Sequence, residues 1–219
     1  MKIYLVRHGE TDWNLSGKAQ GQSDIPLNST GETQALSISK YFSPIDIESI
    51  YSSSVQRALK TASILSINHD TDPIINDNFL EIDFGSLDGE PLNEMRSKFP
   101  LFFKKWTSDP TTAVFPDSKE TLGILQSRTW KGITELVEAH DENDNIVVVS
   151  HAFAIYSILC RALDMPLKNY GRLRLMPGTI SVLEAKKTPG ENFIDTKWTL
   201  TKLNFNPSQG ESCRVWDGC

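Results

Sequence analysis

Two short apolar runs, at residues 3–6 and 146–149, most restrict what this chain can fold into. Each run is too short for a helix and rich in β-forming residues, so each predicts a buried strand. Segments with a helical spacing of apolar residues alternate with these strands along the chain. Such alternation is typical of a mostly parallel sheet covered by helices on both faces. We therefore expect an α/β protein, built as a three-layer α/β/α sandwich with a mostly parallel, mixed sheet.

Weaker patterns predict the remaining elements. We expect parallel strands near residues 3–7, 47–52 and 145–150, a short edge strand at 72–76, a strand at 179–185 and an antiparallel edge strand at 198–203. Helices should follow polar caps: Ser29, which lies in a Ser-x-x-Glu capping box, then a serine at 53 or 54, and finally the segment 117–120.

Residues 79–85 alternate between apolar and acidic types, which predicts a strand. Its apolar side chains would face the core, and Glu81 and Asp83 would lie on a solvated face. A catalytic carboxylate in this stretch is an equally good interpretation.

The length of 219 residues suits a single domain. Prolines interrupt residues 86–118, which we interpret as a helical insertion beside a pocket. An aromatic cluster in the insertion is expected to form its small core: Phe99, Phe102, Phe103 and Trp106. From about residue 204 the tail has no periodicity, so we expect it to be poorly ordered.

The charge balance argues against two classes of partner. The chain has 22 basic and 28 acidic side chains, a net charge of −6, whereas nucleic acids and membrane surfaces favour basic faces. No apolar run approaches the roughly 18 residues of a membrane span, and the first residues lack a signal-peptide pattern. Cys160, Cys213 and Cys219 match no zinc spacing. We interpret them as free thiols of a cytoplasmic protein, with a Cys213–Cys219 loop as the less favoured alternative; a homodimer stays open.

Residues able to hold an anion follow three of the predicted strands. Arg7 and His8 end the first strand, Arg57 lies in the first turn after the second, and His151 follows the strand at 145–150. Taken alone, each could be a surface arginine or a structural histidine. Because parallel strands share a carboxyl edge, the four should gather on one rim. Two guanidiniums and two imidazoles suit a group whose charge is spread over several oxygens, and phosphate fits best.

With its neighbours, this set resembles the histidine phosphatase superfamily, the phosphoglycerate-mutase-like group. Five matching pieces occur in the family's order between residues 3 and about 185: Arg7-His8-Gly9-Glu10-Thr11 with Asn14; Gln20-Gly21-Gln22-Ser23-Asp24 with Pro26-Leu27; Ser52-Ser53 with Arg57-Ala58 and Thr61-Ala62; Leu80-Glu81 with Phe84-Gly85 and Asp88-Gly89; and Ser150-His151. The resemblance implies a metal-independent phosphomonoester hydrolase that needs no cofactor and acts on a small molecule.

The resemblance also implies a role for each catalytic candidate. His8 would be the nucleophile that becomes a phosphohistidine. Arg7, Arg57 and His151 would grip the phosphoryl oxygens. Glu81 would protonate the leaving oxygen and later activate water.

Four further positions match the substrate-binding part of the family pattern. Asn14 and the main chain of Ala152 would help to hold the phosphoryl group. Gln20 and Gly21 would line the substrate side of the pocket. The chemistry is reasonable on general grounds, because an imidazole with a pKa near 6.5 is largely neutral at pH 7 and phosphoryl transfer needs mainly positioning and charge stabilisation.

Within the family, the sequence favours the phosphatase branch over a cofactor-dependent phosphoglycerate mutase. Mutases carry arginine and histidine directly after the acid glutamate, whereas this chain has Ile82 and Asp83, which offer no cation. The insertion is also shorter than a mutase's and lacks its arginine pair. Lys18 and Lys119 depart from the usual arginine and glycine, which bears on specificity more than on chemistry.

Two other classes stay as alternatives. A non-catalytic phosphate-binding module would use Arg7 and Arg57, but has no need of His8, Glu81 and His151 together. A zinc hydrolase would use the histidines, but the sequence lacks H-x-x-x-H and C-x-x-C spacings. The substrate is open: phosphoserine, a sugar phosphate, a phosphoglycerate and a nucleotide-related monophosphate such as α-ribazole phosphate all fit.

Overall fold

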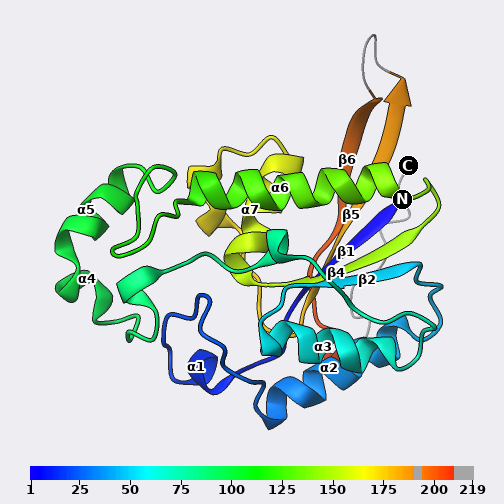
Figure 1. Ribbon diagram of the computed structural model, residues 1–219, viewed down its shortest axis with the longest axis horizontal. Coiled ribbons are helices and arrows are strands. Elements are labelled where there is room, and N and C mark those ends of the chain that lie inside the picture. Colours follow the sequence, from blue (N-terminus) through cyan, green and yellow to red (C-terminus); the bar gives the residue numbers. More distant parts are fainter. Residues whose placement is uncertain (190–193, 210–219) are drawn as a thin grey trace.

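The computed structural model describes residues 1–189 and 194–209, in which strands alternate with helices (Figure 1). The strands are β1 (Lys2–Arg7), β2 (Ser49–Ser52), β3 (Ile74–Ile75), β4 (Asn145–Ser150), β5 (Ile180–Pro189) and β6 (Ile194–Phe205). The α-helices are α1 (Asp12–Leu15), α2 (Ser29–Phe42), α3 (Gln56–Ser66), α4 (Met95–Lys98), α5 (Pro100–Ser108), α6 (Leu122–Ala139) and α7 (Ala152–Ala162). Short 3₁₀ helices are η1 (Asp77–Phe79), η2 (Gly85–Leu87), η3 (Leu167–Arg172) and η4 (Pro207–Gln209).

Within the described residues, one six-stranded sheet has the order β3-β2-β4-β1-β5-β6. The first four strands of this order are parallel to one another. β5 runs antiparallel to β1, and β6 runs antiparallel to β5. The expectation of a mostly parallel, mixed sheet is confirmed, as are the short edge strand at residues 74–75 and the antiparallel edge strand near the end of the chain.

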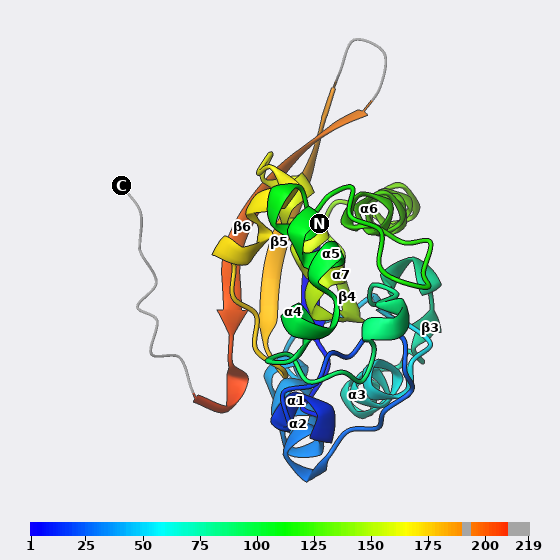
Figure 2. The same cartoon turned by 90° about the vertical axis from the view of Figure 1, so that its left-hand side faces the viewer.

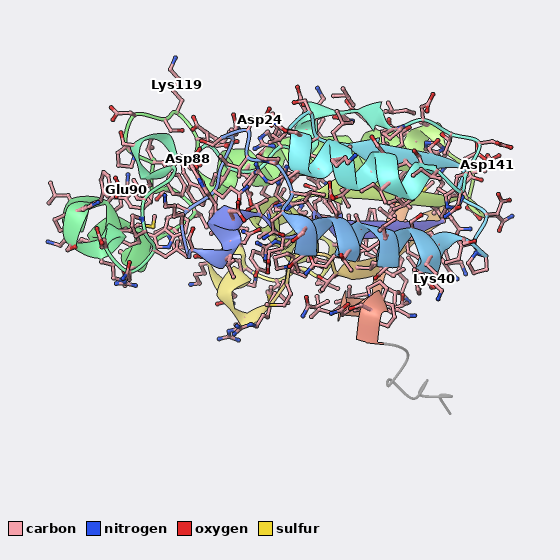
Figure 3. The ribbon with its side chains drawn as sticks, turned by 90° about the horizontal axis from the view of Figure 1, so that it is seen from below. Asp24, Lys40, Asp88, Glu90, Lys119 and Asp141 are labelled. Carbon is pink, nitrogen blue, oxygen red and sulfur yellow. The ribbon has the colours of Figure 1, made fainter. Side chains whose placement is uncertain are left out.

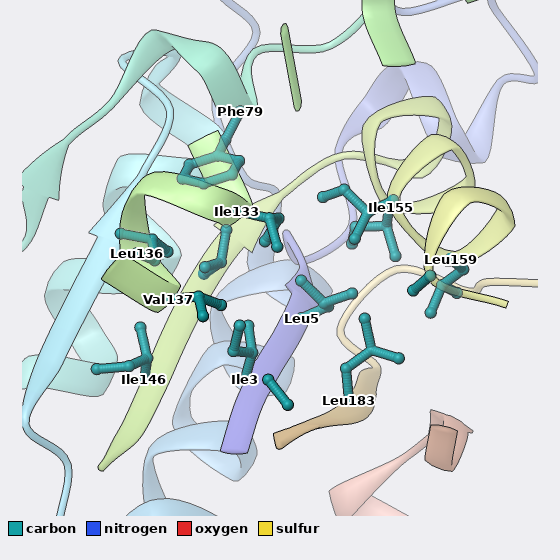
Figure 4. Packing of buried hydrophobic residues seen from close by; sticks show 14 of the residues in the cluster. Ile3, Leu5, Phe79, Ile133, Leu136, Val137, Ile146, Ile155, Leu159 and Leu183 are labelled. Carbon is teal, nitrogen blue, oxygen red and sulfur yellow. The ribbon is translucent and has the colours of Figure 1, made fainter. Parts of the chain in front are cut away.

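The apolar run of β1 is buried on both faces of the sheet. Ile3 and Leu5 belong to a cluster with Ile133 of α6 and Ile155 of α7 (Figure 4). The intervening Tyr4 and Val6 pack instead in a cluster with α2 and α3. Because successive side chains of a strand alternate between faces, a continuous apolar run fits a strand with a helical layer on each side. Figure 1 shows these helix pairs on opposite sides of the sheet, which is the expected α/β/α sandwich.

The helical insertion contains α4 and α5, on the side of the molecule toward which β1 and β4 run (Figure 1). Its aromatic rings pack on one another, with ring centroids 4.8 Å apart for Phe102 and Phe115 and 5.5 Å apart for Phe102 and Trp106. The same hydrophobic cluster includes Ala154 of α7 and Ala19 of the loop after α1. The predicted small core is therefore present, and it is continuous with segments that border the carboxyl ends of the strands.

Two helices begin at other caps than predicted. Asn28 rather than Ser29 caps α2, because its side chain accepts a hydrogen bond from the third backbone N–H after it. Thr121 rather than a residue of the segment 117–120 caps α6 in the same way. In both places the predicted polar residue lies within a few positions of the true cap, and the direction of the preceding backbone decides which side chain reaches the free N–H groups.

The start of α3 differs from the prediction in kind. Val55 precedes the helix and has no side chain that can cap it, so the predicted serine cap is wrong. Asp24 accepts a hydrogen bond from Gln56 N at 2.7 Å instead, and it lies beside the start of α3 (Figure 3). A residue that is distant in sequence thus supplies the cap, together with a negative charge near the positive end of the helix dipole.

The predicted strand at residues 79–85 is wrong. The stretch is irregular between η1 and η2, and Glu81 is buried, with only 3% of its surface exposed. Asp83 accepts hydrogen bonds from Gly85 N at 2.9 Å and Ser118 Oγ at 2.8 Å. The acidic residues therefore serve the interior and a turn rather than one wet face, which is why the alternating pattern misled.

Residues 204–209 are more regular than predicted, whereas the rest of the predicted tail, 210–219, lies outside the described residues. β6 extends to residue 205 and η4 follows it, although we expected disorder from about 204. The paired strands β5 and β6 extend beyond the rest of the sheet (Figures 1 and 2).

Cys213 and Cys219 lie outside the described residues, and Cys160 is a buried free thiol. Among the described helices, none is both long and apolar enough to cross a membrane.

The turn after β1 packs so tightly against the start of α2 that neither side has room for a Cβ atom. A Cβ at Gly9 would lie 2.4 Å from Gly31 O, and a Cβ at Gly31 would lie 2.1 Å from Glu10 O. Gly9 N also donates a hydrogen bond to Thr61 Oγ1 of α3 at 3.2 Å. The glycine after His8 is thus required for a close approach of backbones, and the contact anchors the end of β1 to α2 and α3.

We expect Gly31→Ala to lower the free energy of unfolding by about 1–3 kcal/mol, because the added methyl group must push two backbones apart. Urea denaturation of both proteins measures the difference. Gly171→Ala is the matched control, since a Cβ there meets nothing within 4 Å. An unchanged stability of Gly31→Ala would contradict the close approach.

Candidate active site

The parallel pairing of β1 with β4 brings the two predicted histidines together. Arg7 lies opposite Ser150 in the register, so His8 and His151 follow paired positions at the carboxyl ends of neighbouring strands. Their ring centroids are 5.1 Å apart. Both rings are buried, with 3% of His8 and none of His151 exposed.

The hydrogen bonds of His8 define its tautomer. Nδ1 lies 2.7 Å from Gly9 O, and a carbonyl oxygen can only accept, so Nδ1 carries the proton. Nε2 then holds the free lone pair and accepts from Arg57 Nε at 3.2 Å. Burial, followed by the positive charges of Arg57 and Arg7, holds the pKa of His8 well below its usual value. The ring is therefore neutral at physiological pH.

Arg57 is fully buried and lies in the first turn of α3. Its Nη1 donates to Ser23 O at 2.8 Å and its Nη2 to Gly21 O at 2.6 Å. Burial lowers the pKa of Arg57 to about 10, partly offset by the charge of Glu81 and other nearby carboxylates. The guanidinium thus keeps its charge at neutral pH, held by main-chain carbonyls.

The loop that supplies these carbonyls is held by Asp88. One carboxylate oxygen accepts from Gly21 N at 2.8 Å, and the other accepts from Ser23 N at 3.0 Å and Ser23 Oγ at 2.8 Å. The Gln20 amide lies between the loop and the cation: its nitrogen is 2.7 Å from Thr11 Oγ1 and its oxygen 3.1 Å from Arg57 Nε. Gln20 and Gly21 therefore contact Arg57 directly.

Arg7 and His151 each present a buried nitrogen without a hydrogen-bond partner among the described residues. Arg7 Nη1 donates to Leu175 O at 2.7 Å, whereas Arg7 Nε is unpaired. His151 Nε2 lies 2.7 Å from Ser53 Oγ, whereas Nδ1 is unpaired. Unpaired buried polar atoms are costly, so two of them in one small cluster are a feature of a site that accepts a polar group.

Burial, followed by the positive charge of Arg57 and then by the neighbouring His8 and Arg7, holds the pKa of His151 well below its usual value. Both histidines are thus neutral in the folded protein. The positive charge of the cluster comes from its guanidiniums alone.

Glu81 lies in the same cluster and faces the start of α7. Its carboxylate oxygens accept from Phe153 N at 3.1 Å, Ala154 N at 3.2 Å and its neighbour Ile82 N at 2.9 Å. Burial raises the pKa of Glu81, opposed by the N–H groups of Ile82 and Phe153 and by the nearby arginines. A carboxyl group that retains its proton to higher pH than usual can act as an acid.

The two remaining predicted residues lie at the edge of the cluster. Asn14 forms the capping box of α1 with Thr11, and Thr11 Oγ1 contacts Gln20, so Asn14 is joined to Arg57 through two intermediate side chains. Ala152 is the first residue of α7 and directly follows His151. The structure thus brings Arg7, His8, Arg57, Glu81 and His151 into one cluster and places the substrate-binding candidates around it.

Sequence reasoning assigned no role to several residues that hold the cluster. Ser53 contacts His151, Asp88 holds the loop of Gly21, and Arg128 of α6 donates to the Glu81 carbonyl at 2.9 Å. Ser53 could have been found from its place at the end of β2, beside β4. Arg128 lies within a regular helical pattern, and nothing in that pattern distinguishes it from a surface arginine.

The side chains in and around the cluster suit an anion rather than a metal ion. Within residues 1–189 and 194–209, no group of three or more His, Cys, Asp or Glu side chains is arranged to hold a metal ion. Lys119, one of the departures from the family pattern, is exposed and projects outward (Figure 3). The buried guanidiniums and neutral imidazoles favour an oxyanion such as a phosphoryl group.

Comparisons with known proteins agree with this chemistry. The family model described as histidine phosphatase superfamily (branch 1) matches residues 3–204. The chain is 32% identical over 206 residues to the "Uncharacterized phosphatase PhoE" of Bacillus subtilis (strain 168), covering 93% of this chain and 94% of that protein. It is 32% identical over 211 residues to "Phosphoserine phosphatase 1" of Hydrogenobacter thermophilus, covering 96% and 95%.

Mutase-named relatives also occur. A "Probable phosphoglycerate mutase GpmB" from an Enterobacter species is 28% identical over 86% of this chain and 87% of that protein. Among solved structures, a phosphoserine phosphatase mutant from Entamoeba histolytica in complex with phosphoserine matches with a TM-score of 0.78 and 28% identity, covering 93% of this chain and 96% of that one.

We expect the free energy of unfolding to fall as the pH decreases below about 6.5, because unfolded histidines take up protons that the folded protein excludes from His8. The folded pKa of His8 is lowered, so its contribution is complete above the unfolded value and is lost as the pH falls toward the folded one. The slope for this one residue is at most about 1.4 kcal/mol per pH unit.

Urea unfolding of the wild type and His8→Gln between pH 7.5 and pH 5 measures this contribution. The difference between the two proteins should change with pH in this range, with the wild type losing more stability. His151 and Glu81 are present in both proteins, and burial, the largest cause of each of their pKa shifts, is common to both, so most of their contribution cancels. Parallel stability curves would contradict a neutral, buried His8.

Proposed function

Because the chain belongs to the histidine phosphatase superfamily, we propose that it hydrolyses a small phosphomonoester through a phosphohistidine on His8. The observation that carries the proposal is the state of the His8 ring: neutral and buried, with its proton on Nδ1 and its Nε2 lone pair beside the Arg57 guanidinium. A nucleophile in this state needs no separate base.

In the first step, Nε2 of His8 attacks phosphorus, the N–P bond forms, and the bond from phosphorus to the leaving oxygen breaks. Arg57 gives up its contact with Nε2 and donates to the phosphoryl oxygens instead. Arg7 Nε and His151 Nδ1, which have no partner among the described residues, gain one in the bound phosphoryl group. These donors stabilise the charge of the equatorial oxygens.

Glu81 supplies the proton that the leaving oxygen needs. Its raised pKa, caused mainly by burial, keeps the carboxyl group protonated to higher pH than in water. In the second step the resulting carboxylate takes a proton from water, the water oxygen bonds to phosphorus, and the N–P bond breaks. Inorganic phosphate leaves, and both His8 and Glu81 return to their starting states.

Hydrolysis is favoured over a mutase reaction by the residues that follow Glu81. A mutase must hold a second anionic group of its substrate while the phosphate is reused. Neither Ile82 nor Asp83 carries a positive charge that could hold such a group; Ile82 is fully buried, and the Asp83 carboxylate accepts hydrogen bonds from Gly85 and Ser118. The mutase-named relatives make phosphoglycerate mutase the second candidate.

The relatives' names suggest where a substrate search should start. Phosphoserine and 3-phosphoglycerate are natural first compounds, because solved relatives are described in complex with them. A screen of alkyl and aryl phosphomonoesters then defines the leaving group. Phosphoglycerate interconversion that outpaces hydrolysis would favour the mutase.

We expect the purified protein to release phosphate from p-nitrophenyl phosphate with EDTA present, because guanidiniums supply the positive charge that a metal would otherwise provide. His8→Ala should lower this rate by roughly 10³-fold or more and abolish the acid-labile phosphoenzyme formed from labelled substrate. Turnover lost on adding EDTA would indicate a metal site, no turnover at all would favour a binding module, and labelling that survives His8→Ala would refute the nucleophile.

We expect Glu81→Gln to lower kcat/KM for alkyl phosphates by about 10²-fold or more, and for p-nitrophenyl phosphate much less, because an aryl oxide is a good leaving group without a proton. The ratio kcat/KM reports phosphoryl transfer to the enzyme and is independent of the later water step. For alkyl phosphates the wild-type ratio should fall as the pH rises through the raised pKa of Glu81. Equal slowing of both substrates would exclude Glu81 as the acid.

A further inference from the structure

The backbone that carries Glu81 lacks the support of a strand. Within the described residues, positions 81–83 make no backbone-to-backbone hydrogen bond, and Leu80 N reaches only back to Asp77 O. A carboxyl group must be held near the reacting oxygen with a precision of about 1 Å to be effective. Something other than a β-ladder must therefore hold this stretch.

A single guanidinium, that of Arg128 on α6, takes the place of the ladder. Its Nη1 donates to Asn78 O at 3.0 Å and Leu80 O at 2.8 Å, and its Nη2 donates to Glu81 O at 2.9 Å. Three carbonyls within four residues thus converge on one rigid planar group, which lysine could not reproduce because its ammonium is a single point of charge.

Arg128 is itself held by Glu120. Its Nε lies 2.7 Å from Glu120 Oε1, and its Nη2 lies 3.3 Å from Glu120 Oε2. Glu120 Oε2 also accepts from Asp83 N at 2.7 Å. The pair therefore contacts the stretch on both sides of Glu81, and 21% of the Arg128 side chain and 11% of the Glu120 side chain are exposed.

The side chain and the main chain of Glu81 are held by different partners. Its carboxylate is held by N–H groups of α7, whereas its main chain is held by Arg128 and, more weakly, by Gln22 Nε2 at 3.1 Å. Arg128 touches the main chain of Glu81 and leaves the carboxylate to α7. Its loss should thus change the position of the acid more than the charge around it.

We propose that Arg128, held by Glu120, is a positioning residue that aims the Glu81 carboxyl group at the leaving oxygen. This inference rests on the proposed function, and it adds a residue with no place in the phosphoryl-binding cluster. The hydrogen bonds of Arg128 reach Glu120 and the main chain of the Glu81 stretch rather than the phosphoryl-binding side chains, so the effect of Arg128 should depend on the leaving group as that of Glu81 does.

The test compares Arg128→Lys with the wild type on an alkyl phosphate and on p-nitrophenyl phosphate. The variant keeps a positive charge opposite Glu120 and should fold. We expect kcat/KM for the alkyl phosphate to fall by about tenfold to a hundredfold, with a change of less than about threefold for the aryl phosphate. Lys131→Gln is the matched control on the same helix, where Lys131 forms an exposed ion pair with Glu135 at 3.7 Å. This control should leave kcat/KM unchanged for both phosphates.

A double variant separates positioning from general destabilisation. If Arg128 acts through Glu81, Glu81→Gln with Arg128→Lys should be no slower on the alkyl phosphate than Glu81→Gln alone. Equal slowing of both substrates by Arg128→Lys, or multiplying effects in the double variant, would overturn the inference. If Arg128→Lys melts below the assay temperature, Glu120→Gln replaces it. Glu120→Gln should likewise lower kcat/KM for the alkyl phosphate relative to kcat/KM for the aryl phosphate. An unchanged ratio of these two values would again overturn the inference.

Phosphoenzyme formation and hydrolysis by the wild type separate a failure of the proposed function from a failure of the positioning role of Arg128. If it forms no phosphoenzyme and hydrolyses neither substrate, the proposed function fails and the inference fails with it. If it does both, and Arg128→Lys leaves the ratio of the two substrates unchanged, only the positioning role of Arg128 fails.

Discussion

The parallel pairing of β1 with β4 is the contact on which the site depends. It joins segments more than 130 residues apart, and its register carries the chain on each strand to a histidine at the same edge. Two helical layers bury both faces of these strands, so a shift of one residue would exchange the core-facing side chains of the two layers. The packing that makes the register stable is therefore also what fixes the distance between the two rings.

The cluster at this edge, and Arg128 beside it, combine buried positive charge with very few direct ion pairs among the described residues. Arg57 is held by carbonyls of the loop after α1, Arg7 by a carbonyl near the start of β5, and Arg128 by three carbonyls and one carboxylate. Carbonyl dipoles stabilise a guanidinium without neutralising it. This arrangement favours the binding of anions in a protein that is acidic overall. Of the two buried carboxyl groups in this region, Glu120 pairs with Arg128 and Glu81 forms no direct ion pair among the described residues.

The sequence predicted most strongly what depends on periodicity and on strand ends. The buried strands β1 and β4, the helices between them, the edge strands and the convergence of four side chains on one rim all follow from apolar runs and from the shared edge of parallel strands. The helix caps and the stretch around Glu81 could not be predicted in this way. Asp24 caps α3 from a loop that is distant in sequence, and Glu81 sits in an irregular segment whose alternating polarity imitates a strand. The role of Arg128 could not be predicted for a related reason, because three of its partners are main-chain carbonyls, which every residue has.

The hydrogen bond from His8 to the carbonyl of the next residue has a consequence for how this site tolerates change. The tautomer of the ring is set by an acceptor that belongs to the backbone, so no exchange of a neighbouring side chain can delete it. Only a different path of the chain at Gly9 could do so, and the tight contact with Gly31 restricts that path. Variation among the surrounding residues can therefore reshape the pocket for another substrate while the proposed nucleophilic nitrogen of His8 stays the same.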